Sequence, residues 1–89
     1  MYDSSQVLNK PLHPLKKYRE EKDLTQSQLG FLLNVNGVVI AQIECGFKEF
    51  PYKMLPLLNE QLNIDADAFL EDMNQYRRKY KDFLLKRVS

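Results

Sequence analysis

Few side chains in this sequence could carry out catalysis or hold a metal ion. It contains one histidine, His13, and one cysteine, Cys45, whereas a structural zinc site usually takes four ligands. An acidic cluster at residues 65–72 lacks the glycine and the loop spacing of a calcium site, and it suits the start of a helix instead. No nucleophile stands in a recognisable arrangement with a base. We therefore expect no enzyme activity, no cofactor and no metal, and we expect His13 to be an arm residue without special chemistry.

The segment from Thr25 to Gly46 has the pattern of two short helices joined by a tight turn. Apolar residues recur three or four positions apart, as one face of a helix requires: Leu29 and Leu33 before the turn, Ile40 and Ile43 after it. Asn34 and Gly37 suit the positive-φ conformations that such a corner needs. The pattern is typical of a helix-turn-helix whose buried positions are correctly filled.

The remaining pattern predicts an all-α chain of five helices, because no useful β alternation is present. The expected helices cover residues 14–22, 25–34, 37–45, a segment carrying Leu55, Leu58 and Leu62, and about 65–87. Several residues mark their ends: Pro14 in an opening turn, Thr25 with Gln28 as a capping box, Gly46 as a left-handed cap, and Asp65 or Asp67 as a cap. Pro56 either lies in a first turn or kinks its helix.

Charge is unevenly distributed along the 89 residues, although the net charge is only +1. Residues 14–72 hold six Lys and Arg against ten Asp and Glu, whereas residues 73–89 hold six against one. We expect an N-terminal arm over 1–13, a helix-turn-helix domain over 14–72 and a basic helical extension over 73–89. No run approaches the roughly 20 apolar residues of a membrane span, and no signal peptide is evident. A single cysteine fits a reducing compartment, so we expect a cytoplasmic protein.

With the helices placed, residues 15–70 resemble the Cro-repressor, or Xre, helix-turn-helix family of phage and plasmid regulators. The residues that carry the resemblance are Leu15 to Lys22, Leu24 to Gln26, Leu29, Val35, Ile40, Ile43, Glu44, Gly46, Leu55, Leu58, Leu62 and Ile64. The resemblance implies a compact five-helix Cro/Xre-like domain with an extended C-terminal helix. It also implies an internal ion pair between Arg19 and Glu44.

The same resemblance implies which residues would contact DNA. Gln26 would hold a phosphate, and the positions that face the groove are Asn36, Gly37, Val38, Val39, Ala41 and Gln42. Only Asn36 and Gln42 among them can hydrogen-bond a base edge well. Lys48 could add a local phosphate contact, but the acidic charge of residues 14–72 opposes DNA binding, which depends on neutralising phosphates.

Apolar side chains stand where the family usually has polar or charged ones. They are Phe31, Leu32, Val38 and Val39. Phe47 and Phe50 follow the helix at residues 37–45, and together these side chains suggest an exposed apolar surface. Large exposed apolar patches usually mark partner binding. The alternative is that Leu32, Phe47 and Phe50 pack against the last helix or the N-terminal arm.

The last helix carries apolar residues at the four-three spacing of a heptad seam. These residues are Phe69, Met73, Tyr76, Tyr80 and Phe83. Such a seam predicts a homodimer, and the alternative is packing against the chain's own domain. The basic run at residues 77–81 is either a solvated helix face or a contact for phosphates or an acidic partner.

Two functions follow from the sequence. The first is a phage- or plasmid-type transcription modulator that binds a protein partner, such as a repressor, instead of reading DNA itself. The second is a dimeric operator-binding repressor that reads DNA with the helix at residues 37–45. The apolar start of that helix and the acidic charge around it favour the first.

Overall fold

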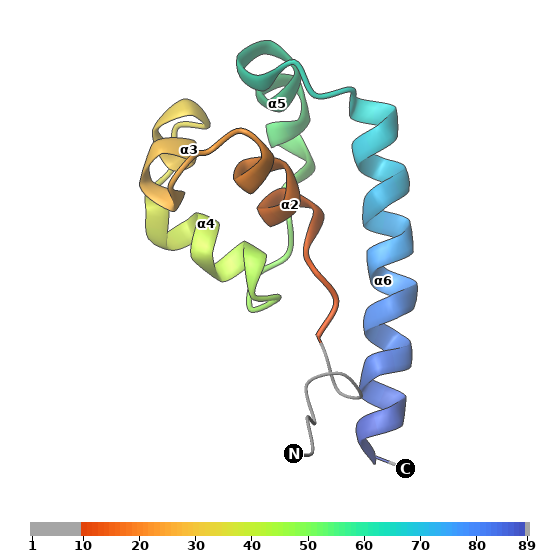
Figure 1. Cartoon of the computed structure of the whole chain (residues 1–89). Coiled ribbons are helices and arrows are strands. Elements are labelled where there is room, and N and C mark those ends of the chain that lie inside the picture. The colour runs from red at the N-terminus through yellow and green to blue at the C-terminus, as the bar shows by residue number, and fades with distance from the viewer. Residues whose placement is uncertain (1–9, 89) are drawn as a thin grey trace.

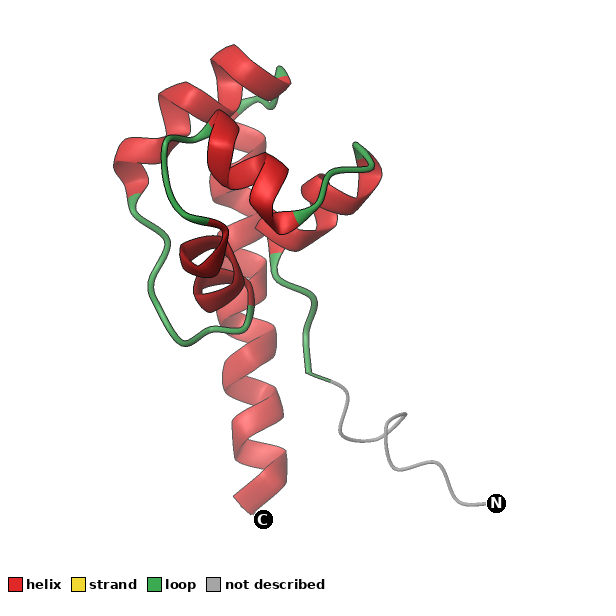
Figure 2. Cartoon of the chain, turned by 90° about the vertical axis from the view of Figure 1, so that its left-hand side faces the viewer, coloured by secondary structure: helices red, strands yellow, loops and turns green. Residues whose placement is uncertain are grey.

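The computed structural model describes residues 10–88, which form helices and loops without any strand (Figure 2). The all-α class with five α-helices is therefore confirmed. The elements are α2 (Pro14–Glu21), α3 (Gln26–Leu32), α4 (Gly37–Glu44), the short 3₁₀ helix η1 (Tyr52–Met54), α5 (Leu55–Leu62) and α6 (Ala66–Val88). The long helix α6 runs along one side of the shorter helices, and its C-terminal part extends beyond them (Figure 1).

Most of the predicted helix ends are confirmed by the hydrogen bonds that form them. The Thr25 hydroxyl accepts from the Gln28 backbone N–H at 3.0 Å, and the Gln28 side chain accepts from the Thr25 N–H at 2.8 Å. Asp65 caps α6 by accepting from the N–H of Ala68 at 2.9 Å. Gly46 ends α4 with a φ of +83°. These local signals fix where the chain changes direction.

The corner between α3 and α4 differs from the prediction in one respect. Asn34 has the expected positive φ, at +61°, but Gly37 does not. Gly37 is needed for a different reason: a Cβ there would stand 3.0 Å from the Cα of Ser27. Gly30 is tighter still, because its Cβ would stand 2.6 Å from the Val35 carbonyl oxygen. Two glycines therefore let the backbones of α3 and α4 approach closely.

Replacing Gly30 with alanine should destabilise the protein by about 1–3 kcal/mol, the usual range for overpacking. In an ordinary helix this substitution stabilises by roughly 0.5–1 kcal/mol, so the clash with the Val35 carbonyl reverses the sign. Chemical denaturation measures the difference directly. A Gly30→Ala variant as stable as the parent chain would show that α3 and α4 lie farther apart than described.

The hydrophobic core draws on every helix, and α6 contributes to it further along its length than the sequence suggested. Phe69, Met73 and Tyr76 are all buried within the chain. The Phe69 ring lies 4.9 Å from that of Phe50 and 5.9 Å from that of Tyr18, centroid to centroid. The core therefore includes residues of the segment 73–89, which the charge pattern predicted to be an extension outside the domain.

No helix within residues 10–88 combines the length and the apolar character that crossing a membrane requires. Met1–Asn9 of the expected N-terminal arm lie outside the described residues. Lys10 to His13 are described, and they run from the C-terminal end of α4 toward the start of α2. Lys10 donates a hydrogen bond to the Cys45 carbonyl and lies 5.6 Å from the centre of the Tyr80 ring.

Candidate functional site

An ion pair between Arg19 of α2 and Glu44 of α4 joins these two helices. The Nε of Arg19 lies 2.7 Å from Oε2 of Glu44, and its Nη2 lies 3.2 Å from Oε1. The pair that the family resemblance implies is thus present and doubly hydrogen-bonded. Arg19 also donates to the Leu24 carbonyl at 2.7 Å. The hydrogen bond with the Glu44 carboxylate raises the pKa of Arg19 above its ordinary value.

Two of the four side chains predicted to contact DNA are engaged inside the domain. The amide nitrogen of Gln26 donates to Oε1 of Glu44 at 3.1 Å. The side-chain oxygen of Asn36 accepts from the Val38 N–H at 2.9 Å and caps α4. Gln42 is half-buried and Lys48 is exposed. The capping bond therefore fixes the orientation of the Asn36 side chain and uses part of the acceptor capacity of its oxygen.

The predicted apolar surface is present in part. Three of its side chains project into solvent: Phe31 is 83% exposed, Val38 61% and Phe47 81%. Leu32 and Val39, expected on the same surface, are instead half-buried and pack against the core. Their burial reflects positions on α3 and α4 that face the neighbouring helices. Phe50 is also a core residue, at 3% exposure. It packs against Phe69 of the last helix, which was the alternative to an exposed position for Phe50.

Phe31 stands between two shallow hollows on the outer side of α3. One hollow, of about 390 Å³, is almost wholly apolar and is lined by Leu24, Ser27, Gln28, Phe31 and Leu32. The other, of about 590 Å³, runs past Asn34 and Asn36 to Gln61 on α5. We call the first of these, with its exposed ring, the Phe31 surface. Its exposed aromatic ring also lines the second hollow.

Phe47 belongs to a different part of the molecule. It follows the C-terminal end of α4, whereas Val38 lies in the first turn of that helix. An eight-residue helix is about 12 Å long, so the two side chains lie at opposite ends of it. The single patch predicted from sequence is therefore divided between the two ends of α4.

The predicted dimer seam on α6 is divided in a similar way. Its first three residues, Phe69, Met73 and Tyr76, are enclosed by the chain's own core and cannot meet a second copy without opening it. Tyr80 and Phe83 are half-buried and stack in series, with ring centroids 5.9 Å apart. Only the part of the seam from Tyr80 onward therefore remains for a contact between copies.

His13 has a structural role that its isolated place in the sequence did not show. It is buried and caps α2, because its Nδ1 accepts from the Leu15 N–H at 3.0 Å. Its ring lies 4.7 Å from that of Tyr76. Burial lowers the pKa of His13 from 6.5 to about 4, because protonation would place a charge in the core and remove the acceptor. The only sequence signal was its place directly before Pro14, where a cap belongs.

His13 should make stability depend on pH in mildly acidic solution. Its pKa is lower in the folded chain, so the stabilisation is complete above the ordinary value of 6.5 and is lost as pH falls toward about 4. We expect a loss of about 2 kcal/mol between neutral pH and about pH 5. Urea denaturation across this range measures it. A His13→Asn variant keeps a capping side chain and should lose the dependence; an unchanged pH profile would assign the effect to other groups.

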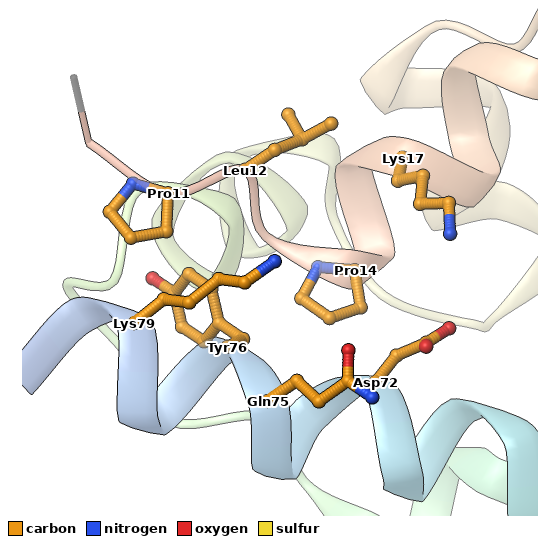
Figure 3. A pocket seen from close by; sticks show the side chains of 8 residues that line it. All are labelled: Pro11, Leu12, Pro14, Lys17, Asp72, Gln75, Tyr76 and Lys79. Carbon is orange, nitrogen blue, oxygen red and sulfur yellow. The ribbon is translucent and has the colours of Figure 1, made fainter.

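A further hollow of about 290 Å³ separates the N-terminal segment from α6. Figure 3 shows Pro11, Leu12 and Pro14 on one side and Asp72, Gln75, Tyr76 and Lys79 on the other. The Tyr18 hydroxyl donates to Asp72 at 2.8 Å, and burial together with this bond raises the pKa of Tyr18 to about 12. Within the described part of the chain, no three His, Cys, Asp or Glu residues lie close enough to hold a metal ion.

Comparison with known proteins does not identify a family for this chain. No protein-family model matches the chain, and no curated protein matches it. The assignment of a function therefore depends on the site geometry and on the charge distribution.

Proposed function

We propose that this chain is a small transcription modulator of phage or plasmid type, with a helix-turn-helix fold, that acts by binding a protein partner such as a repressor. The observation that carries the proposal is the exposure of Phe31 beside an apolar hollow on α3. A solvated phenyl ring is costly to leave uncovered, and aromatic side chains are enriched at the centres of protein interfaces. Val38, in the first turn of α4, is a second exposed apolar side chain of the helix-turn-helix segment.

Electrostatics support a protein partner over DNA. Residues 14–72 hold ten acidic and six basic side chains, so the α3–α4 side of the molecule lacks the positive charge that supplies most DNA affinity. α4 itself has no Lys or Arg between Gly37 and Glu44. The side chains of Gln26 and Asn36 also make hydrogen bonds inside the domain, which reduces what they offer to a nucleic acid.

Lysine substitutions on the exposed positions test the proposal. Phe31→Lys and Val38→Lys should keep the protein folded within roughly 0.5 kcal/mol, because solvent-facing positions tolerate such changes. Both should abolish capture of the partner and the regulation that depends on it. Lys53→Gln, on an exposed lysine of η1, is the matched control and should change neither. Retention of partner capture by both Lys variants would contradict the proposal.

A dimeric operator-binding repressor is the second candidate. It is favoured by the Arg19–Glu44 pair, which the resemblance to Cro/Xre regulators implies, and by the exposed Lys48 beyond the C-terminal end of α4. Gln42 would then read a base edge and Lys48 would contact a phosphate. A Gln42→Ala variant separates the two candidates, because it should weaken operator binding only under the second.

The proposal includes a homodimer that uses the C-terminal part of α6. Leu84 and Leu85 are exposed there, and the half-buried Tyr80 and Phe83 precede them on the same helix. The C-terminal part of α6 extends beyond the shorter helices (Figure 1). Ending the chain after Lys81 should give a monomer with an intact core. Sedimentation equilibrium measures the change, and a truncated chain that stays dimeric would place the interface elsewhere. A cut after Asn74 would be less informative, because it also removes the buried Tyr76.

A further inference from the structure

A separate cavity of about 170 Å³ lies between the C-terminal end of α4 and the middle of α6. Its walls include four apolar or aromatic side chains: Ile43, Phe50, Met73 and Tyr80. An apolar cavity of about 150 Å³ is large enough to bind benzene. This cavity therefore has room for one aromatic ring with a small substituent. None of its lining residues belongs to the Phe31 surface.

The Tyr76 hydroxyl is the feature of this cavity that points to a ligand. Tyr76 is only 8% exposed, and among the described residues its hydroxyl is the one buried side-chain polar atom without a hydrogen-bond partner. It lies 3.5 Å from the position that a Cβ on Gly46 would take, and Gly46 also lines the cavity. Buried hydroxyls nearly always have a partner. A hydrogen-bonding group inside the cavity would supply the missing one.

The other polar residues of the cavity indicate the charge of that group. The Nδ1 of His13 accepts from the Leu15 N–H, so the neutral ring carries its proton on Nε2 and can only donate there. Lys48 and Arg77 line the cavity and are exposed to solvent, opposite a single carboxylate from Glu49. Arg77 also donates to Asn74 at 3.3 Å and to the Tyr52 hydroxyl. The hydrogen-bond donors inside the cavity and the two cations at its edge would both favour a negatively charged group that accepts hydrogen bonds, such as a carboxylate.

We propose that this cavity binds a small aromatic carboxylate of about the size of benzoate. The ring lies against Tyr80 on the open side of the cavity, over the buried Ile43, Phe50 and Met73. The carboxylate accepts a hydrogen bond from the Tyr76 hydroxyl. Lys48 and Arg77 add electrostatic attraction at the open side. Because α4 and α6 both contribute walls, the bound ligand stabilises their mutual packing.

The test is a titration of the full-length protein followed by two-dimensional amide NMR. Benzoate should give saturable shifts around Ile43, Gly46 and Tyr76, with a Kd on the order of 1 mM or tighter for so small a ligand. Benzyl alcohol has the same ring without the charge and should bind more weakly. Inorganic phosphate has charge without a ring and should leave these amides unshifted. The absence of saturable shifts with benzoate, or equal binding of phosphate at the same amides, would overturn the proposal.

Substitutions then show whether the hydroxyl makes the contact. Tyr76→Phe should raise the melting temperature of the free protein, because it removes an unpaired buried hydroxyl, and should weaken benzoate binding about tenfold. Tyr18→Phe alters a tyrosine outside the cavity and should leave the affinity unchanged. If Tyr76→Phe does not fold, Lys48→Gln should weaken binding relative to Lys53→Gln. Unchanged affinity in the folded Tyr76 variant, or equal affinities in the two lysine variants, would contradict the assignment.

Discussion

Replacing Glu44 with alanine should remove about 3–5 kcal/mol of folding stability, the usual cost of breaking a buried ion pair from one side. The Glu44 side chain is 3% exposed and accepts from Arg19 and from Gln26. Its loss leaves the Arg19 guanidinium, itself only 12% exposed, with a single partner in the Leu24 carbonyl. Since small domains have about 5–15 kcal/mol in total, thermal unfolding should shift by more than about 10 °C.

Matched variants separate the pair from general effects of charge. Glu49→Ala removes an exposed carboxylate only five positions away and should change stability by less than about 0.5 kcal/mol. The double variant Arg19→Met with Glu44→Leu removes both charges and should recover much of the loss, because apolar replacements of buried pairs are often neutral. A Glu44→Ala variant no less stable than Glu49→Ala would show that the pair contributes nothing.

Replacing Phe69 with alanine should be equally damaging, at about 3–5 kcal/mol. Phe69 is fully buried, and its ring contacts those of Phe50 and Tyr18. Truncation would leave a cavity at the junction of α2, α6 and the loop before η1. The loss in free energy of unfolding should be the same at low and at high protein concentration, because Phe69 packs within one chain.

Concentration dependence distinguishes the core from the dimer seam that the heptad spacing predicts. If Phe69 lay between two copies, the destabilisation measured by urea denaturation would change with protein concentration. Leu85→Ala provides the comparison, since Leu85 is 55% exposed on the C-terminal part of α6. It should cost little stability and should affect only self-association. A concentration-dependent effect at Phe69 would contradict the packing described for α6.

The parts of the fold that depend on local chemistry were predictable from sequence. The capping box at Thr25, the left-handed conformations at Asn34 and Gly46, and the cap at Asp65 each follow from side chains a few residues apart. Pro56 lies in the first turn of α5, one of the two places predicted for it. Local signals of this kind do not require knowledge of which helices meet.

The features that were missed depend on tertiary packing. A heptad seam looks the same whether it meets a second copy or its own domain, so the burial of Met73 and Tyr76 could not be derived from spacing. Gly30 has no local signature, because its importance comes from the approach of the Val35 carbonyl across the corner. His13 becomes a buried cap only because α6 covers it. The candidate surface was predictable at Phe31, Val38 and Phe47, whereas Leu32 and Val39 turn inward.

Binding to duplex DNA over a range of salt concentrations tests the central claim most directly. If the α3–α4 side binds a protein partner, the isolated chain should bind random and candidate operator duplexes alike, with a Kd above ~10⁻⁵ M at physiological salt. The acidic charge of residues 14–72 predicts this weak and unselective binding. Nanomolar protection of one defined sequence, lost on Gln42→Ala, would contradict the account and would establish the operator-binding alternative.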